Sequence, residues 1–305
     1  MAVQIPSKTR VRAYNNDMIH EIQAKSLLST VHGTDDVFGI KYNFNLYRGC
    51  PHQCIYCDSR SECYGIEDFA DLLVKVNGPE LLARELARKR IKGAIGTGSM
   101  SDPYNPFERR YLLTRHALEV IVRYAFPVHI ITKGDLVVRD IDLLVEIQRT
   151  HAVVCFSLTT TDDALARTLE PGAPPPSARL AAMRALAEHG IPAGTALMPM
   201  LPFITDSEEN ITDVMEQTAA HGGSFVIPWF GMSLRGQQRT WYYRELDRHF
   251  PGLHQKYERV YGERYGCCVP NNSRLADIFN QAAARLGLER RIPHYTPPKI
   301  QPALF

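Results

Sequence analysis

The sequence predicts an α/β protein, a partial (β/α)6 barrel of mostly parallel strands, TIM-like in layout, with a C-terminal helical extension. Two observations predict this class. Short β-rich runs alternate about six times with helical stretches, which is typical of parallel strands joined by crossover helices. Runs such as "AVVCFSL" are also apolar on both faces, as expected where helices cover one side and a barrel interior the other.

The predicted units follow one another from residue 42 onward. Helix ends are marked by Pro79 and Ser177, just before helical runs, and by Gly190 and Gly222, just after them. The predicted strands are 42–48, 92–98, 127–133, 152–160, 191–201 and 224–230. The predicted helical stretches, written with these bounding residues included, are 79–90, 111–125, 140–150, 177–190 and 207–222, followed by a more irregular helical region.

An open doubly wound sheet would show the same alternation, but its phosphate-binding loop is missing. Residues 96–98 form only a fragment of G-x-G-x-x-G, because an Asp-Pro pair stands where the helix should begin. A partial barrel is therefore favoured, with the active site in the loops at the carboxyl ends of the strands. The predicted division is an N-terminal extension at 1–41, the barrel core at 42–233 and the helical region at 234–305.

Composition and charge limit the classes of protein to which this chain can belong. With 45% hydrophobic and 22% charged residues, the chain resembles ordinary globular proteins. It shows neither an apolar run of about 20 residues nor the hydrophobic stretch of a signal peptide, so we expect a cytoplasmic protein with no membrane association. The net charge of +2 is uneven: residues 234–305 carry twelve Lys and Arg against six Asp and Glu, which indicates a polyanionic partner or a basic surface face.

The stretch "RGCPHQCIYC" gathers three of the seven cysteines. Cys50, Cys54 and Cys57 have the spacing Cys-x3-Cys-x2-Cys directly after the first predicted strand. Three thiolates can hold three irons of a [4Fe–4S] cube and leave the fourth iron open to a substrate molecule. A structural zinc site, with Cys63 or His52 as fourth ligand, is an alternative, although zinc knuckles generally come as two paired half-sites. Unligated exposed thiols at this density would be an oxidation hazard.

"CPHQCIYC" resembles the signature Cys-x3-Cys-x-aromatic-Cys of radical S-adenosylmethionine (radical SAM) enzymes. Over most of residues 42–229 the chain is most similar to the branch of spore photoproduct lyase, through "GTGSMSDPYNPFE", "LEPGAPPPSARLAAMRALAEHGIPAG" and "MPMLPFITD". The resemblance implies a [4Fe–4S] cluster on Cys50, Cys54 and Cys57 whose fourth iron chelates S-adenosylmethionine. It also implies a one-electron donor such as a flavodoxin or ferredoxin, whose electron releases methionine and a 5′-deoxyadenosyl radical that takes hydrogen from the substrate.

The same resemblance implies where S-adenosylmethionine is held. Backbone carbonyls of Gly96, Thr97 and Gly98 are expected to meet its amino group, unless this stretch is only a tight turn. Ser157 and Arg179 match positions near the cofactor, and the guanidinium fork suits a carboxylate. The alternative for Arg179 is a solvated arginine on a helix.

Four further residues complete the implied binding site. Glu170 is expected to bind a ribose hydroxyl or to cap local structure. Tyr56 is expected to contact the adenine through its backbone, and Met198, with Leu201, to form an apolar wall for that ring. Ordinary core packing is the alternative for both wall residues.

One departure from the branch bears on the substrate. Spore photoproduct lyases carry a cysteine, in the loop after the second strand, that returns hydrogen to the substrate radical, whereas this chain has Ser99, Met100 and Ser101 there. Photoproduct repair is therefore in doubt. Cys267 and Cys268 are candidates for a replacement donor or for ligands of a second cluster, and idle thiols are the alternative.

The C-terminal region interleaves arginines with aromatic residues. Tyr257, Tyr261 and Tyr265 recur every four residues and share one helix face, and Arg244 and Arg248 are similarly spaced. A helix packing on the barrel is favoured over a surface that stacks nucleic-acid bases. The predicted function is a radical SAM enzyme acting on an unidentified substrate, with nucleic acid a candidate. The alternative is a non-catalytic nucleic-acid-binding module with a structural zinc or iron–sulfur site.

Overall fold

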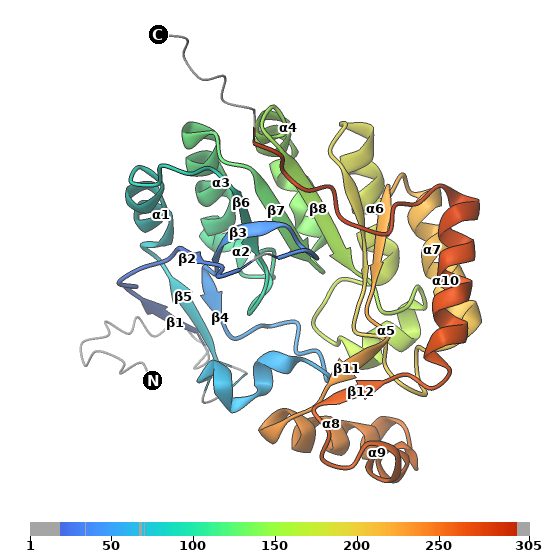
Figure 1. The fold of residues 1–305 in the computed structure, drawn as a ribbon. Helices are drawn as coiled ribbons and strands as arrows, with labels where there is room; N and C mark the ends of the chain where they lie inside the picture. Colours follow the sequence, from blue (N-terminus) through green and yellow to red (C-terminus); the bar gives the residue numbers. More distant parts are fainter. Residues whose placement is uncertain (1–18, 34, 67–68, 70, 298–305) are drawn as a thin grey trace.

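A computed structural model describes residues 19–33, 35–66, 69 and 71–297 (Figure 1). Its main sheet holds six parallel strands in chain order, with one short antiparallel strand at the edge. From that edge the strands are β2 (Ser29–Thr30), β3 (Ile40–Phe44), β6 (Ala94–Thr97), β7 (Val128–Thr132), β8 (Ala152–Ser157), β9 (Ala193–Leu197) and β10 (Phe225–Pro228). The predicted α/β class with a mostly parallel sheet is confirmed.

The sheet is open in the described part of the chain. Its edge strands are β2 and β10, which do not pair with each other. No closed barrel forms there, and the partial-barrel layout stays a prediction.

Helices on the outer face of the sheet connect successive strands (Figure 1). Ser207 begins α7 by accepting a hydrogen bond from the backbone N–H of Asn210 at 3.1 Å, and Asp162 caps α5 in the same way. The connecting helices are α1 (Gly78–Leu86), α2 (Glu108–Tyr111), α3 (Leu113–Tyr124), α4 (Ile141–Gln148), α5 (Asp163–Leu169), α6 (Pro176–Glu188) and α7 (Glu208–Ala220), with the 3₁₀ helix η3 (Asp135–Asp140) before α4. In the described ranges, every helix is too short or too polar to cross a lipid bilayer.

Two smaller sheets depart from the prediction. The predicted strand 42–48 is divided between β3 and the two-residue β4 (Tyr47–Arg48), which belong to different sheets. The second sheet has the order β1-β5-β4, with β1 (Ile19–Ile22) parallel to β5 (Leu72–Lys75), and the sequence did not predict β5. A third sheet pairs β11 (Gly231–Ser233) antiparallel with β12 (Gly266–Cys268).

The C-terminal helices pack beside the main sheet. Helix α8 (Gly236–His249) contacts the 3₁₀ helix η1 (Asp58–Arg60), and α9 (Leu253–Tyr261) contacts α8. Helix α10 (Asn272–Leu286) lies against α7. The division into three regions stays a prediction, and residues 1–18 of the predicted N-terminal extension lie outside the described residues.

The segment after α10 returns to the main sheet (Figure 1). It adds to the free edge of β10, since the N–H of Val226 donates to the Glu289 carbonyl at 2.9 Å and the N–H of Glu289 to the Ser224 carbonyl at 3.0 Å. Ile292 is then buried in an apolar cluster on the inner face of the sheet, together with Val153, Cys155, Ala196, Phe225 and Ile227. The C-terminal segment therefore completes part of the core.

Candidate active site

The three clustered cysteines lie on one loop between β4 and η1. Cys54 is buried and Cys50 and Cys57 are half-buried, and all three thiols are free. The loop begins at Gly49, whose φ is +81° and where a Cβ would lie 2.0 Å from the Asp71 carbonyl oxygen, so glycine is required. The N–H of Ile55 donates to the Leu169 carbonyl at 2.9 Å. The loop is thus anchored to the segment that follows β8.

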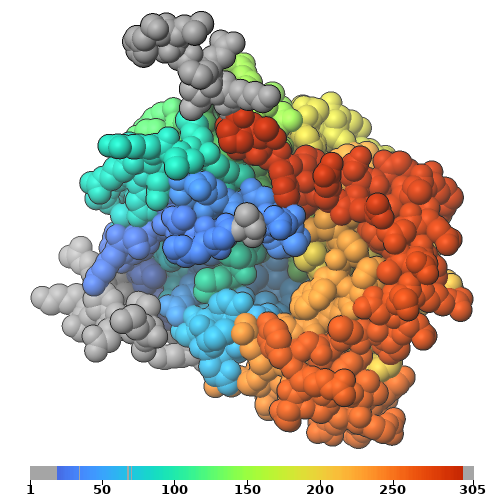
Figure 2. Space-filling model, viewed as in Figure 1, coloured from blue at the N-terminus to red at the C-terminus, as the bar shows by residue number. Residues whose placement is uncertain are grey.

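The three thiols line one cavity of about 100 Å³. Its walls come from the loop after β6 at residues 98–102, from residues 131–133 at the end of β7, and from Ser157 at the end of β8. Figure 2 shows the face of the molecule, hollowed between the blue and cyan N-terminal segments and the orange C-terminal helices. The cavity therefore sits where parallel α/β proteins place their active sites, at the carboxyl ends of the strands.

The number of thiols in the cavity bears on which metal centre they could hold. Among the described residues, no three His, Cys, Asp or Glu side chains converge on one position that would suit a metal ion. A structural zinc ion needs four ligands close to one centre, whereas each thiolate of a [4Fe–4S] cube binds a different iron. Three cysteine thiols alone therefore do not complete a structural zinc site.

Burial changes the proton affinity of these thiols. It raises the pKa of Cys50 to about 12, and the charge of nearby Asp102 adds to the effect. Burial also raises the pKa of Cys54. Both thiols are therefore neutral without a bound cation, and a metal cluster has to displace their protons.

Asp102 connects the cavity loops to one another. Its carboxylate accepts hydrogen bonds from the hydroxyl of Thr132 at 2.6 Å and from the N–H of Lys133 at 2.6 Å. It also lies 3.4 Å from Nδ1 of His52, a cavity residue whose pKa burial lowers. One buried carboxylate thus fixes the loop after β6 to the end of β7 and to the cysteine loop.

A buried ionic cluster lies beside the cavity. Arg179 Nη2 is 2.5 Å from Glu170 Oε2, both side chains are at most 1% exposed, and the Tyr56 hydroxyl donates to Glu170 Oε1. Lys133 Nζ lies 3.9 Å from the same oxygen. Burial opposes ionisation of Glu170, but Arg179 and Lys133 outweigh it and lower the pKa of this carboxyl. Glu170 is therefore a buried carboxylate between two cations.

The predicted site residues divide between these two places. Gly98 and Ser157 line the cavity with the cysteines. A side chain at Gly98 is excluded, since its φ is +98° and a Cβ would lie 2.1 Å from the Ile131 carbonyl oxygen. Tyr56, Glu170 and Arg179 form the ionic cluster, while Gly96, Thr97, Met198 and Leu201 do not line this cavity.

All three nitrogens of the Arg179 guanidinium face partners within the protein. Its Nη1 donates to the Ser157 carbonyl at 2.9 Å and its Nε to the Pro174 carbonyl at 2.8 Å, and Nη2 faces Glu170. A direct contact between Arg179 and a ligand carboxylate, as expected from the sequence, would have to use a guanidinium whose three nitrogens already have partners in the protein.

Two cationic side chains near the cysteines, those of Lys133 and Arg60, were not predicted from the sequence. Lys133 lines the cavity directly after β7. The guanidinium of Arg60 lies between the rings of Phe69 and Trp241, 4.2 and 4.1 Å from their centroids. Its Nε donates to the Cys54 carbonyl at 3.3 Å. The strand pattern could have revealed Lys133, because His129, Ile131 and Lys133 alternate onto one face, but nothing local marks Arg60.

The aromatic stripe of the C-terminal region is mainly structural. Tyr257 and Tyr261 are buried, and Tyr257 packs against both Tyr242 and Tyr261, whereas Tyr265 is 54% exposed. The packing of this helical region on the barrel stays a prediction. Cys267 is buried in the same apolar cluster, and neither it nor the exposed Cys268 lines the cysteine cavity. Tyr257 and Tyr261 are thus not available for stacking bases.

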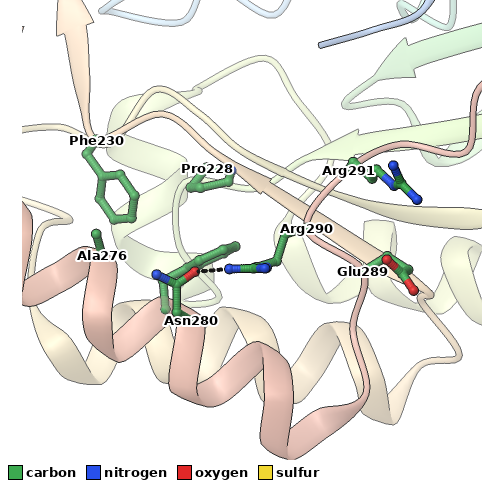
Figure 3. A pocket seen from close by; sticks show the side chains of 8 residues that line it. Pro228, Phe230, Ala276, Asn280, Glu289, Arg290 and Arg291 are labelled. Carbon is green, nitrogen blue, oxygen red and sulfur yellow. Dashed lines mark hydrogen bonds between the residues drawn. The ribbon is translucent and has the colours of Figure 1, made fainter. Parts of the chain in front are cut away.

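A larger cavity, of about 650 Å³, lies elsewhere, between the end of β10 and α10 (Figure 3). Phe230 forms one side, and Arg290 donates a hydrogen bond to Asn280 Oδ1 at 2.8 Å. None of the cysteines or of the predicted site residues lines it. Its size alone does not assign it a role in the chemistry.

Comparison with known proteins gives a family match and close relatives. The sequence model of the Radical SAM superfamily matches residues 44–215, more than half of the chain. Uncharacterized proteins of Mycobacterium bovis and Mycobacterium tuberculosis are each 33% identical over 308 residues, covering 97% of this chain and 88% of theirs. A radical SAM Nalpha-GlyT isomerase of Pseudomonas phage M6 is 27% identical over 181 residues, 59% of this chain and 37% of that protein.

Solved structures share the fold. Spore photoproduct lyase complexed with dinucleoside spore photoproduct has a TM-score of 0.65 at 16% identity, over 88% of this chain and 80% of that one. A variant of that lyase with bound AdoMet and dinucleoside spore photoproduct has a TM-score of 0.64 at 16% identity, over 94% and 86% of the two chains. At this identity, the likeness is one of fold.

Proposed function

The chain belongs to the radical SAM superfamily, and on that premise we propose that it cleaves S-adenosylmethionine reductively at a [4Fe–4S] cluster held by Cys50, Cys54 and Cys57. The observation that carries this proposal is the meeting of three free thiols in one cavity at the carboxyl ends of parallel strands. The presence of three cysteines, where a structural zinc ion needs four ligands, supports a cluster over the alternative of a structural zinc ion.

The division of labour between cofactor and protein follows from this arrangement. A cluster bound by the three cysteines would supply the electron, taken from a donor such as a flavodoxin or ferredoxin, that cleaves S-adenosylmethionine to methionine and a 5′-deoxyadenosyl radical, which would take hydrogen from the substrate. The chain holds the thiols on a loop that Leu169 and Asp102 anchor from two sides. It also keeps Cys54 buried and Cys50 and Cys57 half-buried, which limits the access of water to the reacting groups.

We propose that the ammonium group of Lys133, and not the guanidinium of Arg179, pairs with the carboxylate of S-adenosylmethionine. Lys133 lines the cavity, whereas the donors of Arg179 already face Glu170 and two carbonyls. Gly98 and Ser157 lie on the same wall and contribute backbone and hydroxyl oxygens.

The other residues that the sequence predicts around S-adenosylmethionine keep a role in this proposal. The carbonyls of Gly96 and Thr97 extend the β6 end toward the amino group. Tyr56 contributes its backbone to the adenine, and Met198 an apolar wall, because it is packed against the inner-face cluster of the sheet. Arg179 and Glu170 act as positioning residues: Arg179 binds the Ser157 carbonyl, and Glu170 holds both Tyr56 and Lys133.

For the substrate we propose a molecule that carries a nucleobase. The related lyase was solved with a dinucleoside photoproduct, and the phage relative is named a Nalpha-GlyT isomerase. In this chain Trp229 offers a planar surface: it follows the inner-face residues Phe225 and Ile227 at alternate positions and is 45% exposed. Indole rings stack on bases of any sequence. Repair of the spore photoproduct itself is not proposed, because the loop after β6 has no cysteine.

The test of the cluster uses four single variants: Cys50→Ala, Cys54→Ala, Cys57→Ala and Cys63→Ala. Cys63 is exposed and serves as the matched control. After anaerobic reconstitution, iron and sulfide analysis should give near-complete loss of the cluster in the first three variants and wild-type content in Cys63→Ala. Loss in Cys63→Ala comparable to the others would indicate a fourth protein ligand and remove the open iron.

The test of the reaction is the release of 5′-deoxyadenosine from S-adenosylmethionine after dithionite reduction, measured by chromatography. Slow release without substrate is expected, because shielding is incomplete until substrate binds. Wild-type protein that carries a full cluster and yields no 5′-deoxyadenosine would contradict the proposal. Colourless protein that retains zinc would favour the non-catalytic nucleic-acid-binding module instead.

A further inference from the structure

We propose that one face of α8, formed by Trp241, Arg244 and Arg248, is the surface on which an acidic one-electron donor protein docks to reduce the cluster. This inference rests on the proposed function and adds to it the place where the electron enters. The donor loses one electron and the cluster gains one, and no covalent bond of the chain is made or broken.

The spacing along α8 brings these side chains together. Positions 241, 244, 245 and 248 fall on one helix face. The side chains of Arg244 and Arg248 are 59% and 62% exposed. Glu245, between them, is only 5% exposed and lies 3.9 Å from Arg244 Nε and 3.2 Å from Arg248 Nη1. The single carboxylate of this face is therefore buried, and the charge presented to solvent is positive.

A short path leads inward from this face to the cysteine loop. The exposed guanidinium of Arg244 lies 4.2 Å from the centroid of the Trp241 ring, and the buried guanidinium of Arg60 lies 4.1 Å from it. Arg60 in turn donates to the backbone carbonyl of Cys54 at 3.3 Å. The indole is thus one side chain away from a proposed ligand of the cluster, and helix α8 packs directly on η1.

A second hydrogen bond fixes this approach. Gln238, on the buried side of α8, donates to the Tyr56 carbonyl at 3.0 Å, next to Cys57 in the sequence. The surface helix and the cysteine loop are therefore held as one unit. A protein seated on the Trp241 face would be brought close to the cluster without passing through the substrate cavity, which opens at the strand ends.

The same residues suit a protein better than a nucleic acid. A base stacks on a free aromatic face, but arginines cover the Trp241 ring from both the buried and the exposed sides. What the face offers is a small patch of exposed positive charge. Redox partners meet through small, transient interfaces, and complementary charges speed their encounter. Flavodoxins and ferredoxins of acidic surface supply the opposite charge.

The experiment compares the double variant Arg244→Gln/Arg248→Gln with Arg259→Gln/Arg264→Gln as the matched control. Arg259 and Arg264 are exposed positions of the neighbouring helix α9 and the turn after it, so the control loses the same charge away from the Trp241 face. Reconstituted holoenzyme is titrated with an oxidised acidic flavodoxin by calorimetry at two salt concentrations, and cluster reduction by the reduced flavodoxin is followed by stopped-flow absorbance.

The α8 variant should bind flavodoxin about tenfold more weakly than wild type and lose most of the salt dependence of binding. Its reduction by flavodoxin should slow in proportion, while its release of 5′-deoxyadenosine with dithionite, a small reductant, stays at the wild-type level. The control should match wild type in all three measurements. As a second probe that keeps every charge, Trp241→Leu should slow reduction by flavodoxin more than it weakens binding.

Three results separate the alternatives. Equal flavodoxin affinity in wild type and the α8 variant would overturn the docking face. Loss of affinity for a labelled single-stranded oligonucleotide in the α8 variant, with flavodoxin binding unchanged, would also overturn it and assign the face to nucleic acid. Absence of 5′-deoxyadenosine in wild type with dithionite would instead count against the proposed function, while the binding comparison would still decide the docking face.

Discussion

The ammonium group of Lys133 lies between the cysteine cavity and a buried carboxylate. On one side it lines the cavity of the three cysteines, and on the other it lies 3.9 Å from the buried carboxylate of Glu170. Burial opposes its charge, but the carboxylate of Glu170 favours it, and the pKa of this amine is raised. Lys133 therefore stays positively charged at neutral pH and is suited to bind an anionic group in the cavity.

Replacing Lys133 tests this role. Lys133→Ala should weaken the binding of S-adenosylmethionine by about tenfold to thirtyfold, since the loss of one charge-assisted contact costs on the order of 2 kcal/mol. The dissociation constant is measured by equilibrium dialysis on reconstituted protein. Lys25→Ala, at an exposed position, is the control and should bind normally. Unchanged affinity in Lys133→Ala would transfer the carboxylate contact to another residue.

The pair of Glu170 and Arg179 makes a different prediction, about stability. Arg179→Met alone should lower the free energy of unfolding by about 3–5 kcal/mol, because it leaves a buried carboxylate without its partner. The double variant Glu170→Gln/Arg179→Met should recover a large part of that loss. Urea unfolding of the cluster-free protein measures both. A double variant less stable than Arg179→Met would contradict the structural role of the pair.

Single residues also show what the sequence can reveal about a site. Cys50, Cys54 and Cys57 were recognisable from spacing, and the loop after β6 was expected to approach them. The sequence also marked Arg179 as a site residue, but it did not show that Glu170, nine positions earlier, pairs with the same guanidinium, and the predicted contact of Arg179 with S-adenosylmethionine stays a prediction. Arg60 and Trp241 were missed, since their contact joins positions 181 residues apart.

At the scale of elements, β7 carries a pH-sensitive contact. The side chain of His129 is on the inner face, where its Nδ1 lies 3.0 Å from the Phe38 carbonyl oxygen. Burial lowers the pKa of His129 to about 4, while the Phe38 carbonyl and Asp35 favour the charged form and His151 and His294 oppose it. The folded protein thus keeps this imidazole neutral at pH values where the unfolded chain is protonated.

The lowered pKa of His129 sets how the free energy of unfolding changes with pH. The unfolded state binds a proton at His129 below about pH 6.5 and the folded state only near pH 4, so acidification over this window stabilises the unfolded state. The contribution amounts to about 2 kcal/mol between pH 7 and pH 5. Denaturant titrations at both values should show this difference shrinking in His129→Gln, which keeps a polar side chain but does not titrate. An equal pH dependence in wild type and variant would contradict it.

Elements in the middle of the chain were predicted better than those near the cysteines. The strands β6 to β10 and the helices between them repeat one pattern, in which apolar strands alternate with amphipathic helices. Near the amino end, that pattern fails: residues 42–48 supply strands to two sheets, and β5 pairs with β1 and β4 in a sheet outside the repeat. Short strands that pair with distant segments have little local signal, because tertiary contacts decide them.

At the scale of the whole molecule, the C-terminal segment ties the two ends of the main sheet together. Ile292 is 1% exposed among side chains of β8, β9 and β10, and His294 lies over Gly39, just before β3. From the sequence we predict helices in this region. The sequence does not reveal that an extended segment follows α10 and lies on the sheet. Its contacts join positions more than 60 residues apart, which periodicity does not reveal.

Truncating Ile292 measures the contribution of that segment. Ile292→Ala should lower the free energy of unfolding by about 3 kcal/mol, from lost apolar burial and the cavity that remains. Ile91→Ala is the control, because Ile91 is 62% exposed, and it should change stability by less than about 0.5 kcal/mol. Thermal and urea unfolding give both values. A loss in Ile292→Ala as small as that of the control would show that the segment is not part of the core.

The position of Ile292 also has a consequence during synthesis of the chain. A ribosome makes β8, β9 and β10 long before residues 289–292, yet those late residues cover the free edge of β10 and fill the inner face between these strands. The nascent protein therefore holds an apolar, unpaired strand edge open until translation has passed α10. Such edges invite pairing with other chains. A ribosome that stalls within α10 therefore leaves a product that has most of its helices and strands but in which the edge of β10 and the apolar inner face beside it are uncovered.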